Sequence, residues 1–393
     1  MIARAITPKV LELLEKFPIV AITGPRQSGK TTLSKIVKPN YKYVNLENLS
    51  DREFAKTDPM GFLQTYQNGV IIDEIQNVPS LFSYLQVVTD ERNINGEYII
   101  TGSQNFLMME QISQSLAGRV ALFTLLPMSI QELENTAYKP IFWEDYALSG
   151  SYPRKIIQNI DASDYYENYI KTYVERDVRL LKNISDLDLF QKFIKLLAGR
   201  VGQLFNQSSL GNELDLDNKT INSWFTLLET SFLTFKLQPY HSNFNKVIIK
   251  TPKIYFHDTG LLCYLLGIRN KEDLELHFAK GNVFENLVVS EMYKNSINNA
   301  TKSKIYFWRD KSQNEVDLLI ETGSRLDAIE IKSGKTINQS FFKGLDYFKK
   351  LKMDTKLHLI YGGNENQERT NYKISSIFNL PDFNPNSALE NNH

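Results

Sequence analysis

A glycine-rich segment near the start of the chain constrains the fold more than any other feature. Residues 24–31 read Gly-Pro-Arg-Gln-Ser-Gly-Lys-Thr, between an apolar run at 19–22 and a segment with helical character at 32–37. The segment fits the pattern G-x-x-x-x-G-K-[ST], in which successive backbone N–H groups surround phosphate oxygens at the start of a helix. The sequence therefore predicts a strand, a phosphate-binding loop and a helix; the alternative is a glycine-rich turn before a helix.

The same pattern assigns roles within the loop. Lys30 is expected to contact the β- and γ-phosphates of a nucleotide, and Thr31 is expected to bind Mg²⁺. The residues predicted to bind the nucleotide are Gly24, Pro25, Arg26, Gln27, Ser28, Gly29, Lys30, Thr31 and Thr32.

Two adjacent acids end an apolar run about forty residues after the loop. The run at 70–72 is typical of a parallel strand that is covered on both faces, and the acids are Asp73 and Glu74. Open α/β sheets bind ligands at the carboxyl ends of their strands. We therefore expect Asp73 to bind Mg²⁺, directly or through water, and Glu74 to orient and deprotonate the attacking water. Because no N-K-x-D sequence is present to recognise guanine, the pattern favours an ATPase over a GTPase.

Further residues are candidates for sensing or stabilising the γ-phosphate. Ser103 and Asn105 follow an apolar strand at 98–102, and either is a candidate sensor; the alternative role for Ser103 is a helix N-cap. Arg119 precedes the strand at 120–125 and is either a transition-state group or an interface or surface salt-bridge residue. Arg176 lies on a predicted helix at 163–182, as a candidate arginine finger or as part of a lid held by salt bridges.

The region from about 201 to 275 has the order of a winged helix-turn-helix, with a potential recognition helix at 219–232. The charges there argue against reading a DNA groove. Between residues 206 and 235 four acids are opposed by a single lysine, whereas phosphate contacts need positive charge. We therefore favour a structural or protein-contacting role for this helix over DNA contact.

A second set of charged residues lies in the C-terminal part of the chain. Glu330 and Lys332 are two positions apart on a predicted strand, so they project from one face, and Asp317 lies on the preceding strand. Glu285 lies on a helix before them. The predicted elements are the helix at 281–288, strands at 305–308, 315–320 and 328–332, a helix at 340–350 and a strand at 357–361.

This layout resembles the PD-(D/E)XK nuclease fold. The resemblance implies that Asp317 and Glu330 hold Mg²⁺ and that Lys332 orients or activates the hydroxide that attacks a phosphodiester. Glu285 would add a carboxylate through water. The alternative is a catalytically inactive polar cluster in a domain that binds a protein partner or DNA.

Composition limits the remaining classes of function. Lys and Arg total 45 and Asp and Glu total 45, so a surface for nucleic acid must be local. The single cysteine, Cys263, excludes an intramolecular disulfide framework and a cysteine-rich zinc site. Because no signal-peptide core is present and the apolar runs are too short to span a bilayer, we expect a soluble, cytoplasmic protein without membrane contact.

Together the motifs resemble a family of prokaryotic ATP-binding proteins that join an AAA-type P-loop ATPase to a C-terminal domain of unknown function of the DUF4143 type. The chain departs from the family where Ser149-Gly150 replaces the usual Gly-Gly pair, and its motifs assign no single arginine as an arginine finger. The motifs that carry the resemblance are at 24–32, 73–76, 101–103, 116–119, 315–317 and 330–332.

The resemblance implies an α/β chain with ATP and Mg²⁺ as cofactors. The predicted order is a parallel-sheet P-loop ATPase domain of the ASCE/AAA type at 1–150, a helical lid or linker at 151–200, a winged-helix-like domain at 201–275, a smaller restriction-endonuclease-like α/β domain at 276–383 and a disordered tail at 384–393. Two hypotheses follow. Either ATP hydrolysis controls a C-terminal nuclease that cleaves DNA, or a nucleotide-operated switch binds protein, DNA or a second copy of the chain without cutting.

Overall fold

The computed structural model describes residues 2–103, 108, 111–112, 114–174, 184, 186–241, 249–299 and 303–380. The contacts divide the chain into two compact units. The first unit is Met1–Met128 with Thr230–Phe232, and the second is Ser129–Glu229 with Leu233–His393. Arg176 and the expected disordered tail lie outside the described residues, and the finer division into domains stays a prediction.

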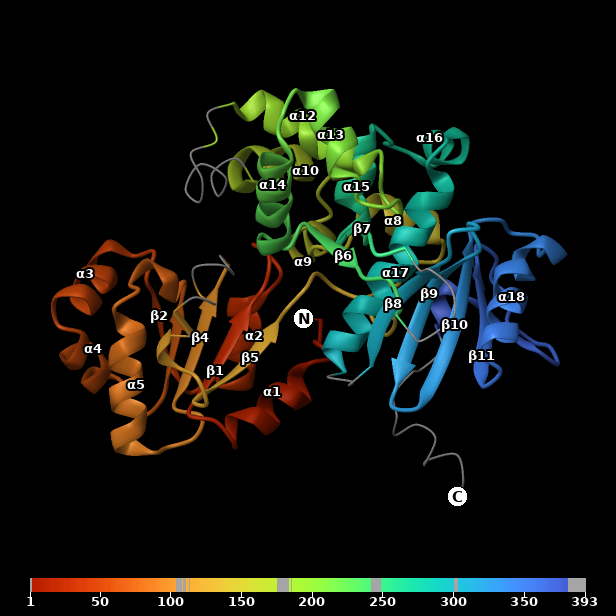
Figure 1. Ribbon diagram of the computed structural model, residues 1–393. Coiled ribbons are helices and arrows are strands. Elements are labelled where there is room, and N and C mark those ends of the chain that lie inside the picture. Colours follow the sequence, from red (N-terminus) through yellow and green to blue (C-terminus); the bar gives the residue numbers. More distant parts are fainter. Residues whose placement is uncertain are drawn as a thin grey trace, which may run out of the picture. The chain divides into compact units, whose positions relative to one another are not determined.

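The first unit is built on a five-stranded sheet in the order β2-β3-β4-β1-β5, in which every paired strand is parallel (Figure 1). Every residue of β1, β3 and β4 is buried, which explains their continuous apolar sequences. The sheet confirms the predicted parallel ATPase fold. Its elements are α1 (Thr7–Leu14), β1 (Ile19–Thr23), α2 (Lys30–Val37), β2 (Lys42–Asn45), α3 (Leu49–Thr57), α4 (Pro59–Thr65), β3 (Val70–Asp73), α5 (Leu81–Arg92), β4 (Tyr98–Gly102) and β5 (Val120–Thr124).

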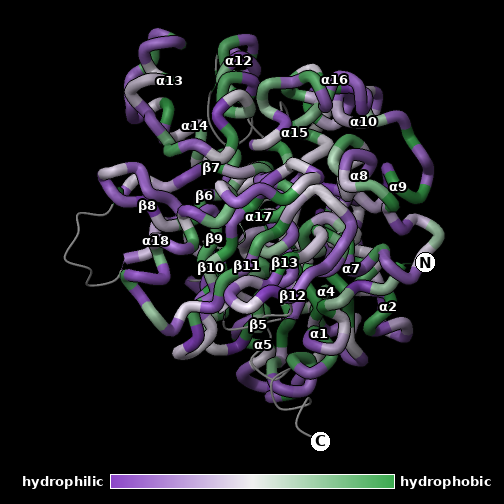
Figure 2. The backbone as a smooth tube through the Cα atoms, turned by 90° about the vertical axis from the view of Figure 1, so that its right-hand side faces the viewer, coloured by the Kyte–Doolittle hydropathy of each residue, from purple (hydrophilic) through white to green (hydrophobic). Residues whose placement is uncertain are grey.

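The second unit contains a mixed six-stranded sheet in the order β12-β13-β11-β10-β9-β8. The β8, β9 and β10 strands are antiparallel neighbours, whereas β10, β11 and β13 run parallel. Figure 2 shows hydrophobic segments along β9, β10 and β11, which form the interior of the sheet. The elements of this region are α17 (Lys280–Asn298), β8 (Lys304–Arg309), β9 (Glu315–Thr322), β10 (Arg325–Lys332), α18 (Lys343–Leu351), β11 (Thr355–Tyr361), β12 (Gln367–Glu368) and β13 (Tyr372–Ser376).

Helices dominate the part of the second unit that precedes this sheet. The helix predicted at 163–182 is α-helical only to Tyr169 and continues as a π-helix over Ile170–Val174. Its Tyr166 and Ile170 side chains are buried, as expected of a core stripe. The elements are α7 (Ile130–Leu133), α8 (Trp143–Ser149), α9 (Pro153–Ile157), α10 (Ala162–Tyr169), α12 (Leu187–Ala198), α13 (Gln207–Leu214), α14 (Asn218–Thr230), the antiparallel pair β6 (Thr234–Leu237) and β7 (Lys253–Phe256), α15 (Thr259–Leu266) and α16 (Lys271–Leu276).

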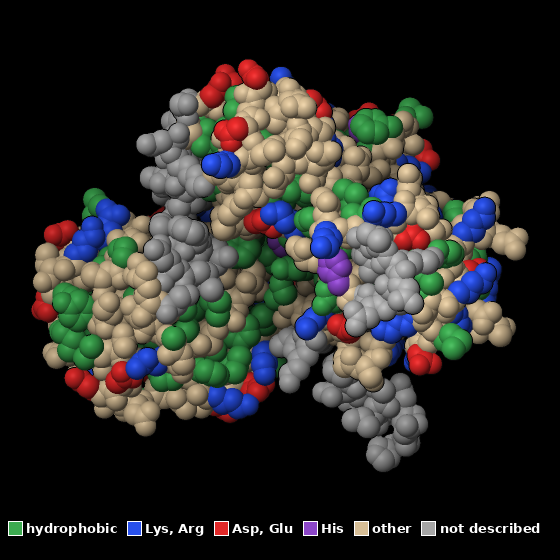
Figure 3. Space-filling model, viewed as in Figure 1, with side chains coloured by type: hydrophobic (Ala, Val, Ile, Leu, Met, Phe, Trp, Pro, Cys, Tyr) green, Lys and Arg blue, Asp and Glu red, His purple; other side chains and the backbone are tan. Residues whose placement is uncertain are grey.

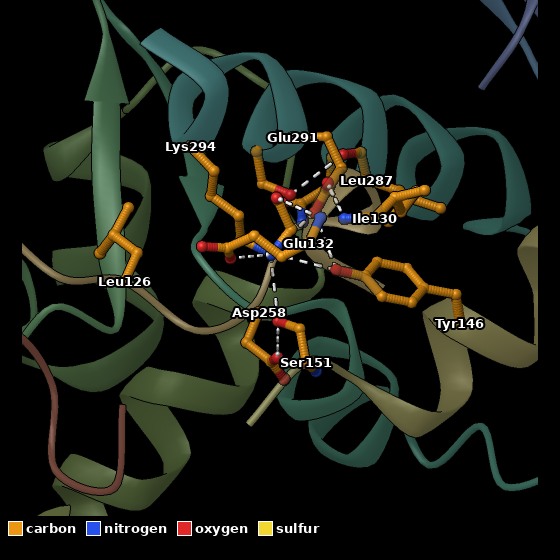
Figure 4. Close-up of polar contacts among 12 residues, drawn as sticks. Leu126, Ile130, Glu132, Tyr146, Ser151, Asp258, Leu287, Glu291 and Lys294 are labelled. Carbon is orange, nitrogen blue, oxygen red and sulfur yellow. Dashed lines mark hydrogen bonds and ion pairs between the residues drawn. The ribbon is translucent and has the colours of Figure 1, made fainter. Parts of the chain in front are cut away.

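A buried polar network ties α8 and the turn after it to α15 and α17 (Figure 4). Lys294 donates hydrogen bonds to Glu291 (2.8 Å) and to the hydroxyl of Ser151 (3.1 Å). Tyr146 donates to the same Glu291 carboxylate at 2.9 Å, and the Ser151 amide and hydroxyl donate to Asp258 at 2.7 and 2.8 Å. Because each buried carboxylate has several donors, its desolvation cost is offset, and we interpret the network as structural.

Charges of both signs are mixed on the face drawn in Figure 3. Figure 3 shows Lys and Arg side chains interspersed with Asp and Glu on the visible face of each unit, in keeping with the balanced composition. Among the described residues, no helix combines the length and the hydropathy needed to cross a bilayer.

The core of the second unit includes a histidine that stays neutral. The His257 ring stacks on Phe235 with a centroid distance of 4.7 Å, and it lies 5.3 Å from the ring of Tyr293. Burial, with a further contribution from the Lys294 charge, lowers the pKa of His257 to about 3. Below the unfolded pKa of about 6.5, the unfolded chain therefore binds a proton that the native chain excludes, and the free energy of unfolding falls as the pH falls from about 6.5 toward 3.

We expect His257→Phe to remove this part of the acid sensitivity. Between pH 7 and pH 5 the wild-type chain should lose about 2 kcal/mol more unfolding free energy than the variant, measured by urea denaturation. His241→Gln is the matched control, because His241 is exposed. Equal losses in the wild type and His257→Phe would contradict the assignment.

Candidate nucleotide site and carboxylate cluster

The loop between β1 and α2 has the backbone geometry of a phosphate cradle. Gly24 and Gly29 have φ angles of 143° and 98°, and Gln27 also has a positive φ of 62°. A Cβ on Gly24 would overlap the carbonyl oxygen of Leu125, so only glycine fits there. Such a loop directs backbone N–H groups toward its concave side, and the N-terminal end of α2 adds a partial positive charge.

Lys30, the first residue of α2, folds back over this loop. Its Nζ donates to the carbonyl oxygens of Gly24 (3.0 Å) and Pro25 (2.9 Å), and the residue is buried. The ammonium group therefore lies against the main chain that would surround a phosphate. A set of loop amides with one ammonium group fits a polyphosphate, because all of these groups donate to anionic oxygens.

Asp73, at the end of β3, lies beside the phosphate loop. Its carboxylate accepts hydrogen bonds from the hydroxyls of Thr31 and Tyr43, both at 2.7 Å, and from the hydroxyl of Thr101. These three donors belong to α2, β2 and β4. Burial, followed by the hydrogen bond to Asp73, raises the pKa of Tyr43 far above its usual value, so this hydroxyl stays a donor. The Thr31 hydroxyl and the Asp73 carboxylate are the oxygen ligands that Mg²⁺ prefers.

Glu74 adopts a left-handed backbone conformation, with φ 54° and ψ 46°. Its carboxylate accepts hydrogen bonds from the amide (3.3 Å) and the hydroxyl (2.9 Å) of Ser103, and from the side chain of Gln76. The structure thus brings Ser103 to Glu74, next to Asp73. The alternative role of Ser103, as a helix N-cap, concerns a following segment at 104–107 that lies outside the described residues.

Arg119 is placed away from this site. It immediately precedes β5, and its carbonyl oxygen accepts from the amide of Ile19, the first residue of β1. That is the amino end of the sheet, whereas the phosphate loop follows the carboxyl end of β1. Its guanidinium forms a two-bond ion pair with Asp90, at 2.5 and 2.7 Å, and this pair lowers the pKa of Asp90. In the structure, Arg119 therefore forms a salt bridge, which is the alternative role given to it in the sequence analysis.

One residue that supports the loop was missed by the sequence analysis. The buried side chain of Arg4 donates to the carbonyl oxygens of Ser28 and Leu126, both at 2.7 Å. Arg4 thus connects the phosphate loop, through Ser28, to the segment after β5, through Leu126. No motif could have identified it, because its partners are main-chain atoms, which carry no sequence signal.

The predicted carboxylate cluster is assembled at one end of β9 and β10. The ladder between these strands ends with the pair Ile329–Leu318, and the amide of Ile331 donates instead to the Asp317 carboxylate at 2.8 Å. Lys332 Nζ lies 2.5 Å from Glu330 Oε1 and 3.6 Å from Asp317 Oδ2. The ammonium group therefore bridges the two predicted metal-binding carboxylates.

Burial and the short distances between the charged groups of this cluster shift the pKa values of Glu330 and Lys332. Burial and then the nearby Asp317 charge raise the pKa of Glu330 to about 8. Burial alone would lower the pKa of Lys332, but the Asp317 and Glu330 carboxylates outweigh it and raise that pKa. The second oxygen of Glu330, Oε2, is buried without a hydrogen-bond partner among the described residues.

The predicted third carboxylate, Glu285 on α17, is paired with residues of β7. It accepts from Tyr255 (2.6 Å) and from Lys253 (3.0 Å), and Lys253 also reaches Glu315 at 2.5 Å. Burial raises the pKa of Glu285, and the nearby Lys253 charge lowers it by less, so the pKa remains above its usual value. The sequence analysis missed Lys253 and Tyr255, because neither belongs to the motif.

The donor set limits which metal this cluster could hold. Within the described residues, no group of three or more His, Cys, Asp or Glu side chains is arranged to bind a metal ion. Asp317 and Glu330 remain a two-carboxylate pair, and Glu330 has one oxygen to offer. Such a pair fits Mg²⁺, which commonly keeps several waters and takes only one or two carboxylates.

Three family models match consecutive parts of the chain. A model described as an AAA domain matches residues 16–134, and it contains the phosphate loop, Asp73 and Glu74. Models described as domains of unknown function match residues 142–272 (DUF8612) and 280–383 (DUF4143). The last of these contains the carboxylate cluster.

The chain is also similar to whole proteins. An uncharacterized protein of Mycobacterium tuberculosis is 31% identical over 324 residues, which cover 82% of this chain and 72% of that protein. An uncharacterized protein of Haemophilus influenzae is 24% identical over 309 residues, covering 70% and 74% of the two chains.

Among solved structures, the Walker-type ATPase paby2304 of Pyrococcus abyssi is 14% identical. It aligns with 66% of this chain and 94% of its own, at a TM-score of 0.42. By its identity and coverage with the mycobacterial protein, the chain belongs to that protein's family, and it joins an AAA-type P-loop ATPase domain to a C-terminal DUF4143 domain.

Proposed function

We propose that the first unit is a Mg²⁺-dependent ATPase that converts ATP to ADP and phosphate. The observation that carries this proposal is the 2.7 Å hydrogen bond between Thr31 and Asp73, which unites the phosphate loop with the acid pair. The loop and Lys30 bind the triphosphate, and Thr31 and Asp73 hold the metal. Bound Mg²⁺ would neutralise charge on the β- and γ-phosphates.

Glu74 acts as the base that orients and deprotonates water, and Ser103 positions it. Both donors of Ser103 reach the same oxygen of Glu74, which holds the carboxylate beside Asp73. A carboxylate held by hydrogen bonds loses less entropy when it aligns water for attack.

We expect Lys30→Ala and Glu74→Gln to separate binding from chemistry. Lys30→Ala removes the ammonium group that would contact the phosphates, so nucleotide affinity should fall by about tenfold or more. A tenfold loss corresponds to about 1.4 kcal/mol of binding free energy. Glu74→Gln should keep the affinity and reduce turnover by roughly 10²-fold or more. Fluorescent-nucleotide titration and phosphate release measure the two effects.

Glu53→Gln provides a matched control for the charge change, because Glu53 is exposed on α3. Wild-type turnover in Glu74→Gln would disprove the role given to Glu74.

For the second unit we propose a Mg²⁺-dependent nuclease whose activity the nucleotide state controls, with DNA as the candidate substrate. Its support is the convergence of Asp317, Glu330 and Lys332 at the ends of two adjacent strands. Asp317 and Glu330 would hold the metal, which would activate water and stabilise charge on the phosphodiester. Lys332 would stay protonated and would donate a hydrogen bond to a phosphate oxygen or orient the attacking water.

The competing proposal is a binding domain without cleavage. It is favoured by the pairing of Lys332 with both carboxylates, because a satisfied ion cluster can be purely structural. The winged-helix-like region formed by α12 to β7 stays a predicted protein-contacting surface on the basis of its acidic charge.

We expect Asp317→Asn to abolish Mg²⁺- or Mn²⁺-dependent cleavage of DNA, because a neutral amide binds the metal weakly. The loss should be roughly 10²-fold or more. Asp354→Asn, at an exposed residue of the same region, is the control. Cleavage is measured on labelled single-stranded and duplex DNA and RNA, with and without ATP. An absence of cleavage by the wild type on every substrate would favour the binding domain.

A further inference from the structure

A pocket of about 520 Å³ lies within the second unit, beside the backbone of Lys332. The amide of Gly362 in its wall donates to the carbonyl oxygen of Lys332 at 2.9 Å, and Tyr361 pairs with Lys332 in the parallel ladder of β10 and β11. The pocket wall therefore contacts the backbone of Lys332, the candidate catalytic lysine. Its volume is in the range of small-molecule sites.

The walls of this pocket offer aromatic rings and a donor. Phe142 is 45% exposed, and Lys271 Nζ lies 4.7 Å from the centre of its ring. The neighbouring Trp143 is buried, and its indole N–H has no acceptor among the described residues. The indole nitrogen of Trp143 lies 3.4 Å from the position that a Cβ would take on Gly362. Because Gly362 has no side chain, nothing from this residue separates the nitrogen from the pocket wall.

Cations border the aromatic wall. Lys335 is 64% exposed and lies 3.2 Å from Glu144. Arg369 also lines the pocket, and its guanidinium donates to the side chain of Gln367. Arg369 also lines a second pocket of about 420 Å³, where Glu368 is the only acid. The other cations of the second pocket are Arg325, Lys349, Lys356 and Lys373. Arg369 is therefore shared by the two pockets, and the second pocket is rich in cations, of which Arg325 is paired with Asp327.

We propose that the first pocket binds an unpaired base of a single-stranded nucleic acid, whose backbone passes Lys335 and Arg369. A base has a flat π-face that stacks on an exposed ring, and its edge carries acceptors for an indole N–H. The adjoining phosphodiester then lies beside Asp317, Glu330 and Lys332. This inference rests on the proposed nuclease and names its substrate class; a paired base would present neither its face nor its full edge.

Equilibrium binding tests the pocket without requiring cleavage. Full-length Asp317→Asn protein is titrated, with and without ATP, into labelled DNA and RNA single strands of about 16 nucleotides and into duplexes, and fluorescence anisotropy is recorded. Adding Phe142→Ala should weaken single-strand binding about tenfold. Adding Lys335→Gln should lower the slope of log affinity against log salt by about 0.7, because one phosphate contact is lost.

The matched controls are Phe278→Ala, at an 83% exposed aromatic residue outside the pocket, and Lys192→Ala, at an exposed residue of α12. The DNA and RNA arms show which strand is preferred, and a preference for either supports the proposal. Binding of Phe142→Ala and Lys335→Gln that matches these controls would overturn it, as would equal affinity for duplexes. Because Asp317→Asn is used throughout, a failure of the pocket is distinct from a failure of the nuclease, which only the cleavage assay reports.

Discussion

The hydrogen bonds at the Asp73 carboxylate are the interaction on which the first unit depends. Hydroxyls of Thr31, Tyr43 and Thr101 reach one acid from three different elements. This meeting is possible because the strands are parallel, so their carboxyl ends, and the loops after them, gather at one edge of the sheet. The backbone of the phosphate loop is held there by Gly24, which has no room for a side chain.

In the second unit, charged side chains also meet at the ends of neighbouring strands, here β9 and β10. Two carboxylates, Asp317 and Glu330, come together where the β9–β10 ladder ends, and like charges so placed repel. The Lys332 ammonium lies between them, and the freed Ile331 amide supports Asp317. These contacts offset the repulsion between the carboxylates, yet they leave Glu330 Oε2 unpaired among the described residues. That oxygen lies in the cluster where the proposed nuclease would hold its metal.

Much of the candidate site could be predicted because its residues lie on regular elements with a known repeat. The separation of Glu330 and Lys332 by two residues places both on one face of β10, as the structure shows. Arg4 could not be predicted, because it binds the carbonyl oxygens of Ser28 and Leu126 and any sequence provides such atoms. The strand β13 (Tyr372–Ser376) was also missed, since its short polar-apolar sequence is ambiguous without its neighbour β11.

By itself, the sequence determined the phosphate loop, the acid pair at the end of a buried strand and the two strands that carry the second cluster. Each is a local pattern, in which backbone conformation and side-chain repeat are set by adjacent residues. Only the tertiary structure decided that Ser103 contacts Glu74, that Arg119 lies at the far end of the sheet, and that Trp143 lines a pocket beside Lys332. Those contacts join residues distant in the chain, and their geometry follows from how strands and helices pack rather than from any nearby sequence.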